Sequence, residues 1–600
     1  MRIAVLVKQI PAFEEMELGP DGRLKRAGLE LEMNAYCRRA VSQGVELAAA
    51  IGDGTVTVFT LGPPSADDVL REAIAWGLEA AVETDGVLIT DPAFAGSDTL
   101  ATARALAAAL EHEGPFDLVF TGRNSVDADT GQVGPELAEL LDLPFATGVR
   151  HVSMKGQTLH LRCEHDDGWV QLEIELPLVA SCAERLIDPC KVPPEVRATV
   201  PAERIRVLGA ADLGAGPWGA AGSPTSVGEV RVHRVHRARH RCTGSAAEQV
   251  REAVSMLEER GALAEPDDDP VAIERVPETG GRAASVGVVL EPDRAHLERE
   301  LLGAAASLAS ELGGRVVALT LATPRATVLG SWGADDVIAI EGDLVEEDVA
   351  RIVAEWATAE PAWAVLAPST AWGREVAARA AARLAAGLTG DAVDLEIAQG
   401  RLVAWKPAFG GQLVAAITAS SPVQMATVRS GMLAQLAPRP STATVRTLTT
   451  RPRERVLVVG RTRDDDLDVL AEARVVVGVG MGGLSPDDYP TLDPLLRVLG
   501  AELGATRKVT DKGWLPRSRQ IGITGRTIAP RLYLALGTSG KFNHMVGVRR
   551  AGTILAVNRD PDALVFDGAD IGIVGESIEV AALLTGELER VRAPAGDAAR

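Results

Sequence analysis

The sequence predicts an α/β protein of two tandem nucleotide-type parallel-sheet domains followed by a doubly wound C-terminal α/β domain. Three observations support this fold class. Short apolar runs alternate with segments of helical periodicity along most of the chain. Small residues dominate, with 60 glycines and an aromatic content of only 4%. The length of 600 residues allows three or four domains, each with its own core.

The first domain is predicted over residues 1–264, with 206–264 as its extension. Apolar runs that read as buried parallel strands occur at 3–7, 55–61, 86–90 and 117–121. Segments with helical periodicity lie between them, at 34–50, 65–76 and 98–112.

The same alternation restarts in a second domain, predicted over residues 282–445. Its strands are expected near 284–290, 315–321, 337–340 and 363–367. Its helices are expected near 294–312, 346–359 and 372–387. The segments AWGLEAAV (75–82) and SWGADDVI (331–338) are similar, so Trp76-Gly77 and Trp332-Gly333 are predicted to cap two equivalent helices.

The stretch 265–281 is acidic and rich in Pro and Gly, which predicts an exposed linker between these domains. A second boundary is expected near 437–455, because APRPSTAT and RPRER occur there. The third domain is therefore predicted over 455–600, beginning with a strand at 455–459.

Composition excludes several classes of protein. The formal charge of −22 argues against nucleic-acid binding, which requires a basic surface. No apolar stretch is long enough to cross a membrane, and the opening MRIAVLVKQIP reads as a strand rather than a signal peptide. The five cysteines show no CxxC pair and no metal-ligand spacing. We therefore expect reduced thiols, no metal and a cytoplasmic location.

The basic run HRVHRARHR (233–241) is the one histidine-rich segment. Its histidines lack regular ligand spacing, so we interpret it as an exposed strand. A metal or anion site is the alternative.

The segment 505–545 carries the strongest chemical signal. It combines three loops of small residues with a cation at Arg507, a hydroxyl at Thr524 and an imidazole at His544. Glycine turns admit a ligand close to backbone N–H groups. A cation and an imidazole suit a ligand that becomes anionic on reduction, so this segment predicts a flavin site.

Two further loops are candidate nucleotide sites. Gly478, Gly480 and Gly483 form GxGxxG after an apolar strand, and Ser485 with Asp488 is expected to cap the next helix. The alternative for these glycines is a tight turn without a ligand. The other loop follows a predicted strand of the first domain and contains Asp127, Asp129, Thr130 and Gln132. A nucleotide site is favoured there over a loop that only caps helix 134–142.

These residues resemble the electron transfer flavoprotein family. MRIAVLVKQIP, MNAYC (33–37), GRNSVDADTGQVGP and GSPTSV (222–227) resemble its β subunit, and KPAFGGQLVAAI (406–417), MATVRSGM (425–432) and 475–575 resemble its α subunit. The chain therefore resembles a natural β–α fusion that replaces the usual heterodimer. The resemblance implies two adenine nucleotide alpha hydrolase-like domains and an FAD-binding C-terminal domain.

The resemblance also implies the FAD contacts. Arg507 and His544 would stabilise the reduced, negatively charged flavin, and Thr524 would hydrogen-bond flavin N5. The full set of implied contacts is Gly480, Thr506, Arg507, Ile521, Gly522, Ile523, Thr524, Gly525, Ser539, Gly540, Lys541, Phe542, Asn543, His544, Asn558, Asp570 and Ile571.

A second nucleotide, either AMP or a second FAD, is implied in the first domain. Its contacts would be Leu6, Asn34, Cys37, Gly122, Asp127, Asp129, Thr130 and Gln132. The loop sequences resemble the second-flavin branch more than the AMP branch.

Three positions depart from the family pattern. Ile523 stands where the family has glutamine, and Met481 stands where it has arginine. The partner-recognition loop corresponds to 186–196, which is proline-rich and shortened. The donor dehydrogenase therefore does not follow from the resemblance.

The resemblance implies an electron carrier rather than a substrate-converting enzyme. It would take electrons from flavin dehydrogenases, such as those of fatty acid β-oxidation, and pass them to a quinone oxidoreductase or another acceptor. One alternative is an NADH-oxidising, electron-bifurcating protein with two FAD. Another is a nucleotide-binding scaffold without redox function.

Overall fold

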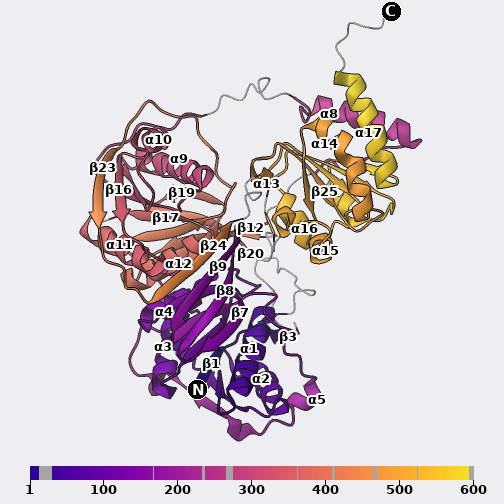
Figure 1. Cartoon of the computed structure of the whole chain (residues 1–600). Helices are drawn as coiled ribbons and strands as arrows, with labels where there is room; N and C mark the ends of the chain where they lie inside the picture. Colours follow the sequence, from indigo (N-terminus) through magenta and orange to yellow (C-terminus); the bar gives the residue numbers. More distant parts are fainter. Residues whose placement is uncertain are drawn as a thin grey trace, which may run out of the picture. The chain divides into compact units, whose positions relative to one another are not determined.

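The computed structural model describes residues 1–11, 30–166, 168–232, 237–264, 274–360, 362–408, 413–463, 469–522, 525–526 and 528–592. The chain divides into two compact units (Figure 1). The first contains Met1–Val232 and Ile273–Arg463, and the second contains His233–Ala272 and Asp464–Arg600. Among the described residues, no helix is both long and apolar enough to cross a bilayer.

A ten-stranded sheet forms the first half of the first unit, in the order β11-β5-β4-β1-β6-β10-β7-β8-β9-β24. The strands from β11 to β7 pair in parallel, whereas β7, β8, β9 and β24 pair antiparallel. The strands are β1 (Arg2–Leu6), β4 (Thr55–Leu61), β5 (Glu83–Ile89), β6 (Leu118–Gly122), β7 (Phe145–Lys155), β8 (Thr158–His165), β9 (Gly168–Glu175), β10 (Leu178–Cys182), β11 (Ile205–Leu208) and β24 (Val456–Arg463). A separate pair consists of β2 (Gln9–Pro11) and β3 (Leu31–Met33).

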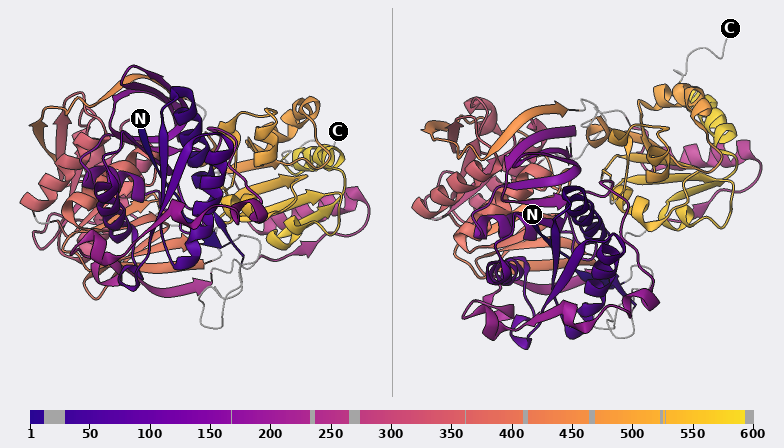
Figure 2. Two further views of the ribbon diagram at one scale, coloured as in Figure 1. Left: turned by 90° about the horizontal axis from the view of Figure 1, so that it is seen from below. Right: turned by 60° about the horizontal axis from the view of Figure 1, so that its bottom comes forward.

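The helices of this half are α1 (Ala35–Ile51), α2 (Asp67–Glu79), α3 (Thr99–Glu113), α4 (Val133–Leu140), α5 (Pro194–Arg197), α6 (Ala210–Leu213) and α7 (Gly219–Gly222). Two buried apolar clusters separate the sheet from the helices. One contains α1 and α2 residues such as Val41 and Leu70, and the other contains α3 and α4 residues such as Leu106 and Leu137. Helices therefore cover both faces of the parallel strands, as Figure 2 shows for the indigo N-terminal strand and its neighbours.

A seven-stranded parallel sheet forms the second half of the first unit, in the order β18-β22-β17-β14-β15-β16-β23. Its strands are β14 (Ser285–Leu290), β15 (Arg315–Thr320), β16 (Asp336–Glu341), β17 (Ala364–Pro368), β18 (Gly387–Ala392), β22 (Gln424–Val428) and β23 (Thr444–Thr449). Its helices are α9 (Ala295–Glu311), α10 (Ala326–Trp332), α11 (Glu346–Ala359) and α12 (Ala371–Leu384). The predicted repeat of strands and helices is thus confirmed in both halves.

A four-stranded antiparallel sheet joins the two halves. It contains β12 (Thr225–Val232), β21 (Leu413–Ala419), β20 (Arg401–Ala408) and β19 (Asp394–Ala398) in that order. Because β12 precedes the predicted linker and the other strands follow it, this sheet ties the two halves into one unit.

The second unit contains a six-stranded parallel sheet in the order β13-β29-β28-β27-β25-β26. Its strands are β13 (His240–Arg241), β25 (Val475–Val479), β26 (Glu502–Ala505), β27 (Leu532–Leu536), β28 (Thr553–Asn558) and β29 (Ile571–Val574). Its helices are α8 (Ala246–Glu259), α13 (Val469–Glu472), α14 (Asp493–Leu499), α15 (Arg507–Asp511), α16 (Phe542–Val548) and α17 (Ser577–Arg592).

Two predicted domain boundaries differ from this arrangement. Residues 237–264 belong to the second unit, because β13 pairs with β29 and α8 packs beside α17. Figure 1 shows the magenta α8 next to the yellow α17. The predicted opening strand of the third domain, near 455–459, is β24, which instead pairs with β9 in the first unit. An apolar run predicts a strand, but it does not specify the partner strand.

Only one of the two predicted helix caps is confirmed. Gly333 caps α10 with a φ of 133°, a value that favours glycine. Trp76 and Gly77 lie inside α2, which continues to Glu79. Gly77 is small for a packing reason, since a Cβ there would lie 2.0 Å from the Thr84 hydroxyl.

Candidate cofactor site

The second unit has a topological switch point at the carboxyl ends of β25 and β27. The chain passes from β25 to β26 on one side and then returns to β27 on the other side of β25. In open parallel sheets a crevice forms where the strand order reverses, and ligands bind there. The loops that follow β25 and β27 contain the predicted residues Gly480 and Ser539–Lys541.

The two loops touch through their backbones. The Gly480 N–H donates to the Leu536 carbonyl at 2.9 Å, and the Gly482 N–H donates to the Gly537 carbonyl at 2.9 Å. A Cβ on Gly480 would lie 2.2 Å from the Gly537 oxygen, so no side chain fits. These glycines are therefore required by packing. Gly478 lies inside β25 rather than in the turn.

The Gly483 turn is more open. Its φ of +80° favours glycine, and the nearest atom to a Cβ would be a Glu576 carboxylate oxygen at 3.2 Å. Ser485 and Asp488 form the predicted cap, with the Ser485 N–H and hydroxyl both 2.7 Å from one Asp488 oxygen. The helix that begins there is a 3₁₀ segment, Pro486–Leu492.

Thr506 and Arg507 lie at the same edge of the sheet, directly after β26. The Thr506 N–H donates to the Val479 carbonyl at 3.0 Å, which places Thr506 beside Gly480. Arg507 begins α15, and its Nε lies 3.3 Å from an Asp511 carboxylate oxygen. The guanidinium is about half exposed, so a ligand at this edge can reach it.

Asn558 ends β28 at the same edge and supports the loop after β27. Its Nδ2 donates to the Thr538 carbonyl at 2.8 Å. Gly540 in this loop has a φ of +72°, and a Cβ there would clash with the Val565 nitrogen. Ser539 and Lys541 are exposed.

His544 is placed differently from the prediction. Its Nε2 lies 2.7 Å from the Tyr533 hydroxyl, and its Nδ1 lies 3.1 Å from the Ile521 carbonyl oxygen. The Ile521 carbonyl can only accept, so Nδ1 carries the proton and Nε2 accepts from Tyr533. Burial lowers the pKa of His544 to about 4, although the Ile521 bond opposes this. The ring is therefore neutral, and protein groups occupy both nitrogens.

Three glycines near His544 (Gly504, Gly522 and Gly547) are required by close packing. Ile521 is a core residue, and a Cβ on Gly504 would clash with it. Gly522 packs against Gly547 of α16, where a Cβ would lie 2.5 Å from the Gly522 nitrogen. The Gly525 N–H donates to the Gly522 carbonyl at 3.0 Å. Ile523 and Thr524 lie outside the described residues, as do the side chains of Phe542 and Asn543.

Asp570 and Ile571 do not lie with the other predicted contacts. They stand at the amino end of β29, whereas the other loops follow the carboxyl ends of their strands. Asp570 is 1% exposed and accepts from Arg237 at 2.7 Å and from Arg260 at 3.0 Å. It also accepts from the Ile554 N–H at 2.9 Å. Asp570 therefore attaches segment 237–264 to the sheet, and Ile571 is core.

Glu576, which follows β29 at the ligand-binding edge and lies beside the Gly483 turn, was missed by the sequence analysis. Both residues flank the same strand, Asp570 before it and Glu576 after it. Only the direction of the strand shows which carboxylate reaches the crevice. A carboxylate at this edge can accept a ribose hydroxyl. Tyr533 was missed too, because a tyrosine inside an apolar strand reads as core.

The first unit has a second switch point, at the carboxyl ends of β1 and β6, and the predicted second-nucleotide residues gather there. Leu6 ends β1 and Gly122 ends β6. A Cβ on Gly122 would lie 3.1 Å from the Cys37 sulfur. The buried Asn34 donates to the Asn124 carbonyl at 2.8 Å and accepts from the Val126 N–H at 3.2 Å, which fixes the start of the polar loop.

Within that loop Asp127 pairs with Lys8, a residue the sequence analysis missed. The Lys8 Nζ lies 2.8 Å from an Asp127 oxygen. Burial would raise the pKa of Asp127, but Lys8 and Ser125 outweigh burial and the pKa is lowered. Lys8 is half exposed at the switch point, where a phosphate could bind it.

Asp129, Thr130 and Gln132 lie against the second half of the unit. The Gln132 Nε2 lies 3.3 Å from the Leu388 carbonyl oxygen, and Thr130 lies beside Gly390. Asp129 has a φ of +47°. Burial lowers the pKa of the partly exposed Lys406, and the negative charges of Asp391 and Asp129 oppose this shift. Both halves of the first unit thus contribute to this site.

Glu136, also missed, completes this polar group. It is 1% exposed, and the Thr99 hydroxyl lies 3.0 Å from its Oε1. Burial raises the pKa of Glu136 to about 8. Its Oε2 has no hydrogen-bond partner within the described part of the chain.

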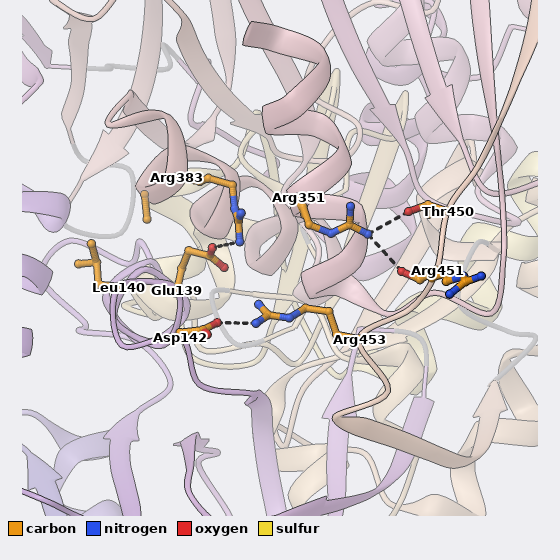
Figure 3. A pocket seen from close by; sticks show the side chains of 9 residues that line it. Glu139, Leu140, Asp142, Arg351, Arg383, Thr450, Arg451 and Arg453 are labelled. Carbon is orange, nitrogen blue, oxygen red and sulfur yellow. Dashed lines mark hydrogen bonds and ion pairs between the residues drawn. The ribbon is translucent and has the colours of Figure 1, made fainter. Parts of the chain in front are cut away.

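A groove of about 780 Å³ in the first unit holds none of these residues. It is lined by Glu139, Leu140, Asp142, Arg351, Ala382, Arg383, Thr450, Arg451 and Arg453. Figure 3 shows Arg383 directed toward Glu139, and Arg453 toward Asp142 at 2.6 Å. Arg351 donates to the Thr450 hydroxyl at 3.0 Å. The Arg383–Glu139 and Arg453–Asp142 ion pairs join the two halves, and the groove lacks the glycine loops of a nucleotide site.

The two switch points define an α/β protein with two candidate nucleotide sites, one in each unit. The strand order β26-β25-β27-β28-β29 is the doubly wound order that binds a flavin at its switch point in flavodoxin-like sheets. The residues at this switch point fit a flavin nucleotide. The glycine loops leave room for it, and both the half-exposed Arg507 and the Glu576 carboxylate are available to bind it. His544 does not fit the role predicted for it.

Comparison with known proteins gives the family. The model described as "Electron transfer flavoprotein domain" matches residues 21–208 and 289–452, together more than half of the chain. The model described as "Electron transfer flavoprotein FAD-binding domain" matches residues 469–549. The chain belongs to the electron transfer flavoprotein family.

Individual relatives match different parts of the chain. The electron transfer flavoprotein subunit alpha of Thermoanaerobacterium thermosaccharolyticum is 34% identical over 309 residues, which is 49% of this chain and 93% of the relative. The subunit beta of that organism is 36% identical over 269 residues, 44% of this chain and 100% of the relative. Protein FixB of Rhizobium meliloti is 34% identical over 320 residues, 50% of this chain and 91% of the relative. The chain is therefore a fusion of β-type and α-type parts.

Proposed function

We propose that this chain is a single-chain electron carrier with FAD in the second unit. It takes electrons from partner flavin dehydrogenases, including those that act on acyl-CoA substrates, and passes them to a quinone oxidoreductase or a similar acceptor. The observation that carries the proposal is the β25/β27 switch point. There Gly480, Thr506, Arg507 and Asn558 converge within and next to the segment that matches the family's FAD-binding domain.

The residues at this edge have distinct tasks. Backbone N–H groups of the loops after β25 and β27 would hold the phosphates, and Glu576 would accept a ribose hydroxyl. Arg507 would place a positive charge beside the ring system, which supplies the redox chemistry when bound. His544 and Tyr533 would support the Ile521–Gly522 turn from inside the core.

A second nucleotide in the first unit is part of the proposal. Lys8, Asn34 and the loop 123–132 meet at the β1/β6 switch point, and their polarity exceeds what a helix cap requires. A second FAD there would favour the alternative function, an electron-bifurcating protein that oxidises NADH. AMP would favour the simple carrier.

Counting the nucleotides released by denaturation tests the proposal. We expect one FAD with one AMP, or two FAD, per chain. Mixing the purified protein with NADH then separates the two functions, because only the bifurcating protein loses its flavin absorbance rapidly. A protein that stays colourless after addition of FAD would refute both and leave a scaffold without redox function.

A further inference from the structure

The edge of the second unit's sheet brings three metal-binding side chain types together. β13 pairs with β29, and the Cys242 N–H continues the ladder to the Gly572 carbonyl at 2.9 Å. Side chains alternate along this strand. Arg241 lies on one face, with its guanidinium 3.7 Å from the centre of the Phe566 ring. His240 and Cys242 share the opposite face.

Glu252 reaches this face from α8. One of its oxygens lies 2.7 Å from His240 Nε2, and the other accepts from the Thr243 N–H at 3.2 Å. The His240, Cys242 and Glu252 ligand atoms all lie within 4.8 Å of one another. A small shift would bring all three to a common ion.

The burial of the group suits an ion that enters from solvent. Cys242 is 5% exposed, whereas the side chains of His240 and Glu252 are 42% and 38% exposed. The thiol forms the closed inner side, and the other two ligands form the open side. The Thr243 N–H orients the carboxylate, which is the kind of outer contact that holds a metal ligand in place.

We propose that His240, Cys242 and Glu252 form a binding site for a zinc-like transition-metal ion, with water as the fourth ligand. A thiolate and an imidazole select zinc over magnesium or calcium, which prefer oxygen ligands. Three protein ligands and one water complete a tetrahedral zinc site, the coordination found in catalytic zinc centres. The thiol loses its proton on binding.

The ion would hold β13 to α8. Both elements precede the linker in the sequence, yet they complete the sheet and helix layer of the second unit. Binding at this place would stabilise the attachment of segment 237–264, because a ligand that binds only the folded state raises its stability. The site lies apart from the β25/β27 switch point along the sheet order, so it is independent of the flavin proposal.

Zinc binding by the full-length purified protein tests this inference. After treatment with a chelator and equilibrium dialysis against zinc, we expect one zinc per chain. X-ray absorption at the zinc edge should show one sulfur at about 2.3 Å together with lighter ligands. Cys242→Ser should remove the sulfur signal, and Cys242→Ser, His240→Ala and Glu252→Gln should each weaken binding at least about tenfold.

His160→Ala is the matched control. His160 and Glu173 form a comparable histidine–glutamate pair, with Nδ1 3.1 Å from Oε1 and exposures of 39% and 35%, but without a thiol. This variant should keep full zinc binding. Circular dichroism checks that each variant is folded, and Glu252→Gln on the open side serves if Cys242→Ser is not. The inference fails if wild type retains no zinc, or if zinc binds Cys242→Ser or Glu252→Gln as tightly as wild type.

Discussion

At the residue scale, Arg507 is the cation that we expect to lie beside the bound flavin. Arg507→Ala should lower the reduction potential of the bound flavin, because a nearby cation favours the reduced, negatively charged form. A loss of about 1.5 kcal/mol, typical of a bond to a charged group, corresponds to about 30 mV for a two-electron couple. Redox titration measures the potential. Arg507→Lys should recover part of it, and the exposed Arg590→Ala on α17 should leave it unchanged.

His544 makes a different, pH-dependent contribution. Its pKa falls from 6.5 when unfolded to about 4 in the folded protein. The unfolded chain therefore binds a proton that the folded chain excludes. The free energy of unfolding is therefore highest above pH 6.5. It falls as the pH drops toward 4, by about 1.4 kcal/mol per pH unit for this one proton.

Denaturant unfolding between pH 4 and pH 7 tests this prediction. His544→Gln has no group that titrates in this range, so the stability of the second unit should fall less steeply with acid. Tyr533→Phe keeps the imidazole but leaves Nε2 without a donor, at a cost of about 1–3 kcal/mol. Equal pH slopes in wild type and His544→Gln would show that the imidazole is not held neutral.

At the element scale, strands and helices follow from the sequence, but partners and edges do not. The apolar run at 55–61 predicted β4 at its observed bounds, and the helical pattern at 346–359 predicted α11 at its observed bounds. Buried strands and amphipathic helices have distinct periods, so the sequence separates them. β24 was also predicted as a strand, yet its pairing with β9 depends on sheet geometry far along the chain. Asp570 was named from the family resemblance, and only the direction of β29 in the sheet shows that Glu576, rather than Asp570, follows the strand at the ligand-binding edge.

Leu6, Gly122 and Asp127, three of the residues predicted to contact a second nucleotide, lie near one another at the β1/β6 switch point. They follow the ends of two early strands, and parallel strands bring such ends together. His240, Cys242 and Glu252 were separated by a turn and the start of α8, so no ligand spacing appeared in the sequence. Lys8 lies just after β1. It could have been predicted as a site residue, because polar residues that follow neighbouring parallel strands lie at the same edge of the sheet.

A substitution of Asp570 tests whether this carboxylate supports the fold or contacts the cofactor. Asp570→Asn should destabilise the second unit by about 3 kcal/mol or more, because it leaves the buried Arg237 without its carboxylate. The flavin potential should stay near the wild-type value, since Asp570 lies at the amino edge. Proteolysis should then release segment 237–264 more readily. A large loss of flavin affinity without loss of stability would return Asp570 to the cofactor site. Asp562→Asn, on an exposed loop, is the control.

At the scale of the whole molecule, the two units have separate cores. In the first unit, buried clusters form around β1 and β4 and around β14 and β17. In the second, clusters from α8, α17 and the six-stranded sheet include residues on both sides of the linker. Because each unit has its own buried clusters, we expect the fused chain to keep two folding units.

Denaturant unfolding should therefore show two transitions, each sensitive to its own buried ion pairs. Arg379, 1% exposed, lies 3.2 Å from Glu139 and 3.3 Å from Glu375. Arg379→Leu should lower the free energy of unfolding of the first unit by about 3 kcal/mol, because it removes the cation beside the buried Glu375 and leaves Glu139 paired with Arg383 alone. The exposed pair of Arg446 and Glu360 supplies the control Arg446→Leu, which should have little effect.

Asp570→Asn should shift only the other transition, and flavin fluorescence released on unfolding should follow that transition alone. The two variants act on different cores, so their effects should add in the double variant. A single transition that both variants move together would mean that the two units fold as one. The two units defined by their contacts would then not be independent in folding.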